Sequence, residues 1–181
     1  MFKMKRKFKI LLTRRLHDFA LTELREKCEI TIHSGKIPMP KQKILEEIKD
    51  KDGLICFPYD IIDQEILYSA NKLKTISTYS VGFDHIDINC AKKKRITIGY
   101  TPDVLTNATA ELTIGLILDL LRRITEGDHI IRKGKWNKIF GPFDYVGTEV
   151  SGKTLGILGM GRIGKTVAKK ASCLGMNILQ S

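Results

Sequence analysis

The sequence is poor in cysteine and histidine for its 181 residues, and neither type is clustered. The cysteines are widely spaced and form no CxxC pair: they are Cys28, Cys56, Cys90 and Cys173. Such spacing is typical of reduced thiols, and it argues against a disulfide framework or a zinc site. The four histidines are equally scattered. We therefore expect no metal site.

The sequence also lacks a long apolar segment. Its longest apolar run, residues 112–121, is interrupted by a threonine, a glycine and an aspartate, and it falls short of the roughly 20 residues that a membrane span requires. The N-terminus is basic, with Lys3, Lys5, Arg6, Lys7 and Lys9. The apolar stretch that follows, residues 10–12, is too short for a secretory signal. These features predict a cytoplasmic protein without a membrane partner.

The net charge of +11 raises the question of nucleic-acid binding, which clustered lysine and arginine residues would favour. The positive residues are instead spread along the chain. The one tight run, residues 92–95, follows an apolar helix segment and has no interleaved aromatic residues for base stacking. We interpret this run as a solvated helix end, and nucleic acid is the least favoured partner.

Strand-like and helix-like patterns alternate over the first hundred residues, which predicts an α/β fold with a parallel sheet. The expected strands are residues 9–13, 29–33, 53–57, 73–78 and 95–99. The expected helices are residues 18–27, 42–49, 63–71 and 87–93. The hydrophobic content of 43% is sufficient to build a core for such a fold.

A long helix is expected over residues 107–124, because apolar residues recur there at helical spacing and cover most of its surface. Such a helix is predicted to be buried on most sides, at an interdomain or subunit contact. The following stretch, residues 134–150, contains three glycines and the only tryptophan, Trp136. We interpret it as a loop-rich connector to a second α/β unit.

That second unit begins with the strongest motif in the sequence. Residues 154–158 form an apolar strand, and a GxGxxG turn follows directly: Gly159, Met160, Gly161, Arg162, Ile163 and Gly164. In a Rossmann unit the first glycine permits the tight turn, the second leaves room for a pyrophosphate, and the third allows close helix–strand packing. The complete strand–turn–helix–strand context predicts that the chain binds NAD or NADP.

A second candidate site follows the expected strand 73–78. Ser80, Val81 and Gly82 lie where a strand end opens into a glycine, so their backbone N–H groups could hold an anion such as a substrate carboxylate. An ordinary turn explains the same residues, with Asp84 and Asp87 as local caps. The residues alone leave both interpretations open.

Three blocks together resemble the D-isomer-specific 2-hydroxyacid dehydrogenase family. They are YSVGFDHIDI (79–88), TPDVLTNATAELTIGLIL (101–118) and GKTLGILGMGRIGKTVAKKASCLGM (152–176). The resemblance is greatest to the members that act on glyoxylate, hydroxypyruvate or phosphoglycerate. It implies an NAD(P)-dependent oxidoreductase acting on the CH–OH group of small D-2-hydroxy acids.

The resemblance also implies a domain organisation. A flavodoxin-like substrate domain would occupy residues 1–100, followed by the start of a Rossmann dinucleotide-binding domain over residues 101–181. In the family the long helix of this second domain, here residues 107–124, mediates dimerisation. We therefore expect a homodimer, or an assembly with a separately encoded C-terminal half.

Individual roles follow from the same resemblance. The Val81 and Gly82 amides would hold the substrate carboxylate, and Thr106 would lie near the nicotinamide end of the cofactor. Arg162 and Ile163 would lie at the pyrophosphate. From the residues alone, Thr106 is equally well explained as the N-cap of the long helix, and the two roles are compatible.

The sequence departs from the family pattern at its end. The family's catalytic arginine, its glutamate–histidine pair and the residue that distinguishes NAD from NADP have no counterpart, and neither His85 nor His129 lies in the catalytic motif. We therefore expect the 181-residue chain alone to be inactive. A Rossmann sheet that stops after two strands would leave an unpaired edge, so we hypothesise a truncated or split-gene product. The alternatives are a non-enzymatic NAD(H)-binding module and an inert remnant.

Overall fold

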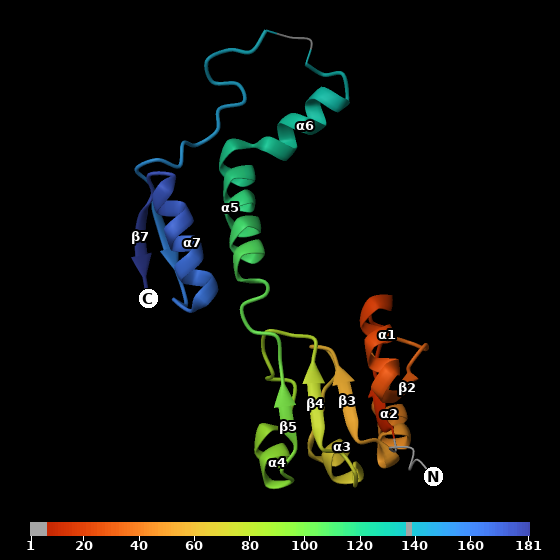
Figure 1. The fold of residues 1–181 in the computed structure, drawn as a ribbon. Coiled ribbons are helices and arrows are strands. Elements are labelled where there is room, and N and C mark those ends of the chain that lie inside the picture. Colours follow the sequence, from red (N-terminus) through yellow and green to blue (C-terminus); the bar gives the residue numbers. More distant parts are fainter. Residues whose placement is uncertain (1–6, 137–138) are drawn as a thin grey trace, which may run out of the picture. The chain divides into compact units, whose positions relative to one another are not determined.

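The computed structural model describes residues 7–136 and 139–181, which form two compact units, Met1–Pro102 and Asp103–Ser181 (Figure 1). Lys3, Lys5 and Arg6 of the basic N-terminus lie outside the described residues, as do residues 137–138 of the expected connector. The two units are described separately below.

The first unit is built on a five-stranded sheet whose strands are all parallel. The strands are β1 (Phe8–Leu12), β2 (Cys28–Ile32), β3 (Gly53–Cys56), β4 (Thr75–Thr78) and β5 (Thr97–Gly99). Their order in space is β2-β1-β3-β4-β5, which is the flavodoxin-like order. The predicted α/β fold with a parallel sheet is therefore confirmed.

Helices connect these strands. They are α1 (Asp18–Lys27), α2 (Lys41–Glu47), the 3-10 helix η1 (Ile48–Asp50), α3 (Gln64–Ser69) and α4 (Ile88–Lys93). The aspartates before α3 and α4 act as N-caps: Asp63 accepts a hydrogen bond from the Ile66 amide, and Asp87 accepts one from the Cys90 amide at 2.9 Å. The expected cap at Asp87 is thus confirmed.

The core of the first unit lies where one apolar row crosses the sheet. Leu11, Leu54 and Ile76 are register partners on adjacent strands, and each is at most 1% exposed. Side chains from α2, η1, α3 and α4 join the same cluster. Gly53 and Ile10 lie on the opposite face of the sheet, since successive residues of a strand alternate between faces. A Cβ at Gly53 would lie 2.6 Å from Ile10 Cδ1.

The second unit consists of two helices followed by a β-α-β unit. Its elements are α5 (Thr106–Arg122), α6 (Ile124–Arg132), β6 (Thr154–Ile157), α7 (Arg162–Cys173) and β7 (Asn177–Gln180). Strands β6 and β7 pair in parallel, as the motif predicted. A small core joins Val150, Ala171 and Met176 with half-buried residues of α5 and both strands.

The structure corrects the predicted end of the long helix, whereas its expected burial at an interdomain or subunit contact stays a prediction. The helix ends at Arg122 because Arg123 adopts a left-handed conformation (φ 57°), and a second helix, α6, follows that the sequence did not predict. In the chain as described, α5 is also not buried on most sides. Leu112, Leu116 and Leu120 are 64%, 59% and 78% exposed, and Ala110 is its only buried residue among those described.

The connector after α6 is attached to the α5–α6 corner. The Thr148 amide donates to the Leu121 carbonyl at 2.7 Å, and the Arg123 guanidinium lies 4.7 Å from the centre of the Tyr145 ring. Gly147 is required at this contact, since a Cβ there would lie 2.8 Å from the Leu121 oxygen. No helix or strand occurs between α6 and β6 in the described residues, which fits the expected loop-rich connector.

The buried row formed by Leu11, Leu54 and Ile76 predicts that the same isoleucine-to-alanine change has different effects on stability at a buried and at an exposed position. Ile76→Ala should lower the free energy of unfolding by about 2–5 kcal/mol, because it leaves a cavity in the core. Ile61→Ala, at a position that is 70% exposed, should change it by less than about 0.5 kcal/mol. Chemical denaturation followed by circular dichroism measures both, and equal losses would contradict this core assignment.

Candidate functional site

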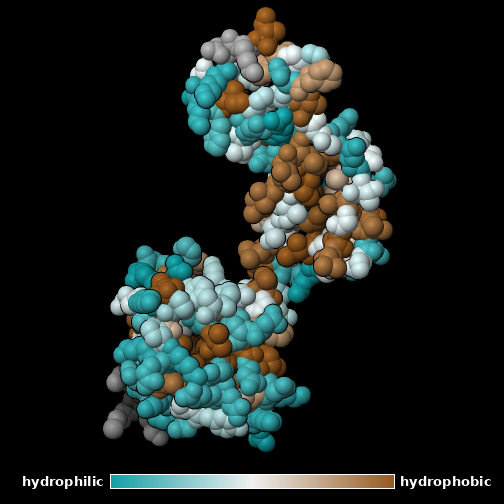
Figure 2. All heavy atoms as spheres, turned by 180° about the vertical axis from the view of Figure 1, so that it is seen from behind, coloured by the Kyte–Doolittle hydropathy of each residue, from teal (hydrophilic) through white to brown (hydrophobic). Residues whose placement is uncertain are grey.

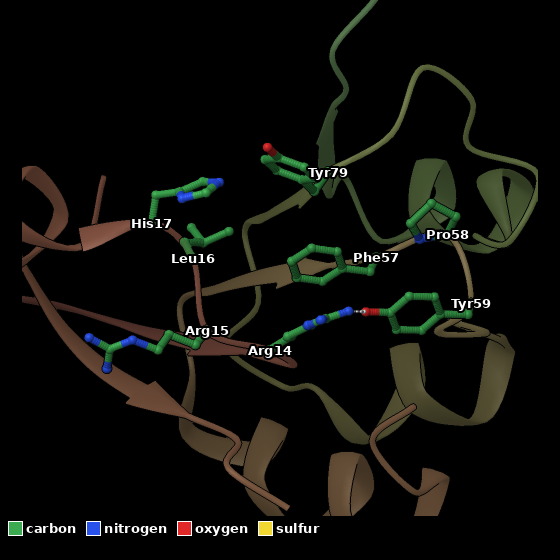
Figure 3. Close-up of a pocket in the computed structure, with 8 residues that line it drawn as sticks. All are labelled: Arg14, Arg15, Leu16, His17, Phe57, Pro58, Tyr59 and Tyr79. Atoms are coloured by element: carbon green, nitrogen blue, oxygen red, sulfur yellow. Dashed lines mark hydrogen bonds between the residues drawn. The ribbon is translucent and has the colours of Figure 1, made fainter. Parts of the chain in front are cut away.

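In the first unit a candidate site lies where the chain leaves the ends of three neighbouring strands. In a flavodoxin-like sheet, ligands bind beyond the carboxyl ends of the strands, at the point between β1 and β3 where the order reverses. A pocket of about 590 Å³ lies there (Figure 3). Its lining follows β1, β3 and β4: Arg14, Arg15, Leu16, His17, Phe57, Pro58, Tyr59 and Tyr79.

The pocket combines aromatic walls with a cation. The Phe57 ring stacks on Tyr59 at 5.8 Å and lies 5.3 Å from the Tyr79 ring. The Arg14 side chain runs along Phe57, 6.0 Å from the ring centre, and its guanidinium donates to the Tyr59 hydroxyl at 2.9 Å (Figure 3). Such a pocket suits a small anionic molecule with an apolar body.

Sequence reasoning missed this pocket because its residues come from three separate segments. The available signal was that the residues following the β3 and β4 strands are aromatic, and that arginine follows β1. Parallel pairing brings these strand ends to one edge of the sheet.

A buried carboxylate ties together two of the segments that line the pocket. Asp60 is 2% exposed, and its Oδ2 accepts hydrogen bonds from the Phe57 amide at 2.8 Å and from the Thr13 hydroxyl. These contacts tie the loop after β3 to the end of β1. Its other oxygen, Oδ1, is buried without a hydrogen-bond partner among the described residues.

The loop after β4 carries the two residues expected to hold a carboxylate. Val81 is 38% exposed, and its amide has no acceptor within the described part of the chain. The Gly82 amide donates to Ser80 Oγ over 3.2 Å. Thr101 anchors this loop, because its amide and hydroxyl both donate to the Ser80 carbonyl. The Val81 N–H group thus has no hydrogen-bond acceptor among the described residues, and the Gly82 N–H group has a long bond to a hydroxyl.

In the second unit, the glycine turn lies between β6 and α7. Gly159 has a φ of +94°, which favours glycine. Gly164 lies against the turn itself, since a Cβ there would lie 2.2 Å from the Gly159 oxygen. Gly161 precedes α7 as its N-cap residue, and a Cβ at that position would meet nothing within 4 Å.

The open space at Gly161 coincides with an uncapped helix end. No side chain caps α7, and the first N–H groups of a helix have no intrahelical acceptor. These groups, together with the helix dipole, favour an anion. The site thus has the donors and the space that a pyrophosphate requires.

The other residues expected at the cofactor lie around this turn. Met160 is half-buried, and Ile163 is 36% exposed. Arg162 is the first residue of α7, and its guanidinium pairs with Asp103 at 3.1 Å. Both of these side chains are largely exposed, so the pair contributes little to stability. It links the glycine turn to the segment that precedes α5.

The N-cap interpretation of Thr106 is wrong. Helix α5 begins at Thr106 itself, and Leu105 occupies the capping position without a side-chain hydrogen bond. The Thr106 amide donates to the Asp103 carbonyl at 3.2 Å. This turn at Asp103, rather than a threonine cap, starts the helix, and the Thr106 side chain makes no hydrogen bond within the described residues.

A smaller pocket of about 400 Å³ lies next to the glycine turn. It was not predicted from the sequence. Its lining is mostly apolar: Thr113, Ile117, Leu155, Gly156, Ile157, Leu158, Gly159, Ile163, Gly164 and Val167.

Over residues 7–136 and 139–181, no group of three or more histidine, cysteine or acidic side chains is placed to hold a metal ion. The cysteines in this part of the chain are free thiols. No helix there is long and apolar enough to span a membrane.

Comparison with known proteins shows what the chain is similar to. The family model for the catalytic domain of D-isomer specific 2-hydroxyacid dehydrogenases matches residues 10–176. The glyoxylate reductase of Thermofilum pendens is 47% identical over 172 residues, which are 94% of this chain and 51% of that protein. The chain thus spans about half the length of the curated relatives it matches.

Solved structures agree with this similarity. The TT0316 protein of Thermus thermophilus superposes with a TM-score of 0.85 at 42% identity, over 95% of this chain and 55% of that one. The D-lactate dehydrogenase of Aquifex aeolicus, in complex with NAD and lactic acid, gives a TM-score of 0.80 at 28% identity. This match covers 95% of the present chain and 50% of the dehydrogenase.

The geometry of the glycine turn predicts that alanine lowers stability at Gly164 but not at Gly161. Gly164→Ala should lower the free energy of unfolding by about 1–3 kcal/mol, because two backbone segments must separate to admit the new Cβ. Gly161→Ala should change it by less than about 0.5 kcal/mol, because its Cβ would enter open space. Thermal melting of the two variants and the wild type measures the difference. A Gly164→Ala protein as stable as the wild type would contradict this geometry.

Proposed function

Because the chain belongs to the D-isomer specific 2-hydroxyacid dehydrogenase family, we propose that it forms the substrate and cofactor-binding parts of an NAD(P)-dependent oxidoreductase. Residues 1–100 are the substrate domain, and residues 101–181 form the NAD(P)-binding part. The reaction is hydride transfer to or from the CH–OH carbon of a small D-2-hydroxy acid, such as the product of glyoxylate or hydroxypyruvate reduction. The observation that carries this proposal is the glycine turn at the uncapped start of α7.

On the substrate side, the Val81 and Gly82 amides hold the carboxylate. The Val81 amide is available, and the Gly82 amide exchanges its long bond to Ser80 for one to the ligand. Hydrogen bonds to a charged carboxylate are shorter and stronger than those to a neutral hydroxyl, which favours this exchange. The pocket formed by Phe57, Tyr59 and Arg14 adjoins the same strand end through Tyr79 and accepts the rest of the substrate.

On the cofactor side, the residues present fit a dinucleotide. The open space at Gly161 and the α7 N-terminus receive the pyrophosphate, with Met160, Arg162 and Ile163 around it. A bound phosphate competes with Asp103 for the Arg162 guanidinium. Thr106 lies toward the nicotinamide end, by resemblance to the family. The nicotinamide supplies the hydride chemistry, while the protein supplies binding and orientation.

The residues of this chain account for binding rather than for proton transfer. The family's catalytic arginine and glutamate–histidine pair have no counterpart in the sequence. We therefore propose that these 181 residues bind carboxylate and cofactor, and that turnover requires groups outside them.

The exposed side of α5 supports a further part of the proposal, which is pairing with a second copy. Leu112, Leu116 and Leu120 recur every four residues and so lie on one face of the helix. Figure 2 shows hydrophobic residues gathered on the second unit, whereas the first unit is mostly hydrophilic in this view. Contiguous apolar surface of this kind marks a protein contact.

A chimera tests the proposed activity. Fusing the chain to the remaining part of the Thermofilum pendens relative should yield NADH- or NADPH-dependent reduction of glyoxylate, with a turnover number on the order of 1 s⁻¹ or more. The 181-residue chain alone should show no turnover. In a Gly161→Asp chimera the new carboxylate would repel the negatively charged pyrophosphate, so this substitution should abolish the reaction. A folded chimera that binds NADH but reduces no 2-oxo acid would contradict the assignment.

A charged substitution tests the proposed pairing. The wild-type chain should show twice its monomer mass in size-exclusion chromatography with light scattering. Leu116→Glu should show the monomer mass, because the apolar contact would bury a carboxylate. Asn107→Glu, also exposed on α5, serves as the matched control and should leave the mass doubled. A monomeric wild type would contradict the proposal.

A further inference from the structure

The loop that carries Val81 and Gly82 is closed by a side-chain contact at its base. Thr78, the last residue of β4, is 1% exposed. Its Oγ1 lies 2.9 Å from Nε2 of His85. The contact joins the two ends of the segment 79–84, which includes both proposed carboxylate-binding residues. The conformation of the loop therefore depends on the position of His85.

The backbone of His85 is itself held from a second direction. Its carbonyl accepts a hydrogen bond from the Ile62 amide at 2.8 Å, and the Asp87 amide donates to the Ile62 carbonyl at 3.0 Å. These bonds form the isolated bridge between Ile62 and Ile86. His85 is thus attached to the segment after β3 by its backbone and to the end of β4 by its side chain.

Few ionisable groups face this imidazole. Burial lowers the pKa of His85, and the carboxylates of Asp60 and Asp84 oppose that shift. Beyond Thr78 lies Cys56, whose pKa is raised to about 12, chiefly by burial, and which hydrogen-bonds the Thr78 hydroxyl. Cys56 therefore stays a neutral thiol when His85 titrates. The imidazole is the group here that changes charge near neutral pH.

The contact between Thr78 and His85 persists in both charge states. The neutral imidazole can accept the Thr78 hydroxyl proton at Nε2, whereas the imidazolium must donate from Nε2 to the Thr78 oxygen. In the second case the Thr78 hydroxyl proton turns to the Cys56 sulfur. Protonation therefore adds a positive charge at the base of the loop without breaking its closure.

We propose that His85 is a positioning residue for the Val81 and Gly82 amides, and that its charged form strengthens carboxylate binding by this loop. The inference rests on the carboxylate site of the proposed function. His85 is three residues from Gly82, so their Cα atoms are at most about 11 Å apart. This upper bound exceeds the Debye length of about 8 Å at physiological ionic strength, so the attraction depends on the partly buried surroundings, in which charges are screened less.

The direction of the pH effect follows from linkage. Above its pKa, His85 is neutral and only positions the loop. As the pH falls through that pKa, the imidazolium attracts the carboxylate, so binding tightens. By reciprocity, a bound carboxylate raises the pKa of His85 by the same coupling.

The test uses the ¹⁵N-labelled chain with oxalate as a carboxylate probe that cannot be reduced in the reaction. Amide shifts of Val81 and Gly82 are recorded between about pH 5 and pH 8, the range in which histidine titrates, with and without oxalate. The variants are His85→Ala and His85→Gln, the second of which keeps a hydrogen-bonding side chain. His129→Ala, on α6 of the second unit, is the control.

In the wild type, the Gly82 amide shift should titrate with a midpoint below 6.5, and oxalate should raise that midpoint. Oxalate should bind His85→Ala about 2- to 10-fold more weakly, which corresponds to one net hydrogen bond. His85→Gln should restore the affinity at high pH but not its increase at low pH. His129→Ala should match the wild type.

Two results would overturn the inference. The first is a His85→Ala protein with wild-type oxalate affinity at every pH. The second is a Gly82 amide whose pH titration is unchanged in both His85 variants. If oxalate binds none of the proteins, the proposed carboxylate site fails. The role of His85 in positioning the loop is then decided by the Gly82 titration alone.

Discussion

Parallel strand pairing is the constraint on which both candidate sites depend. Because all strands of a parallel sheet run the same way, their carboxyl ends meet at one edge, and each connection must cross back over a face. In the first unit this edge collects Arg14 after β1, Phe57 after β3 and Val81 after β4. In the second unit the same constraint places the glycine turn at the end of β6, where α7 begins.

Close contacts fix the positions of the backbone groups at this edge. Gly164 packs against the Gly159 carbonyl, so the start of α7 lies directly over the end of β6. In the first unit, Asp60 ties the loop after β3 to the end of β1, and His85 ties the loop after β4 to the end of β4 itself. In both units the groups proposed to meet the ligand are backbone amides, which neighbouring residues hold in place.

The parts that could be predicted from sequence depend on local physics. Short apolar runs located the strands of the first unit to within about two residues, because buried parallel strands need continuous apolar segments. The glycine spacing located the turn at Gly159, because the positive φ of Gly159 and the close backbone contact at Gly164 both require glycine. Asp87 was recognised as a cap, since its partner lies three residues away.

The parts that were missed depend on contacts between distant segments. The Arg14 pocket joins residues from three strand ends, and no local pattern shows which ends become neighbours. The left-handed Arg123, which ends α5, is stabilised in part by Tyr145 from the connector. The start of α5 was misassigned to a Thr106 cap because the turn at Asp103 has no simple signature. His85 lies outside the family's catalytic motif, and no local pattern shows its contact with Thr78 at the end of the preceding strand.

The central claim is that the chain binds a dinucleotide at the glycine turn. The most direct measurement is a titration of the ¹⁵N-labelled chain with NADH, followed by amide chemical shifts. The account predicts saturable shifts that are largest at Gly161, Arg162 and Ile163, and that disappear in Gly161→Asp. Unchanged amides at these positions, or equal shifts in Gly161→Asp, would contradict it.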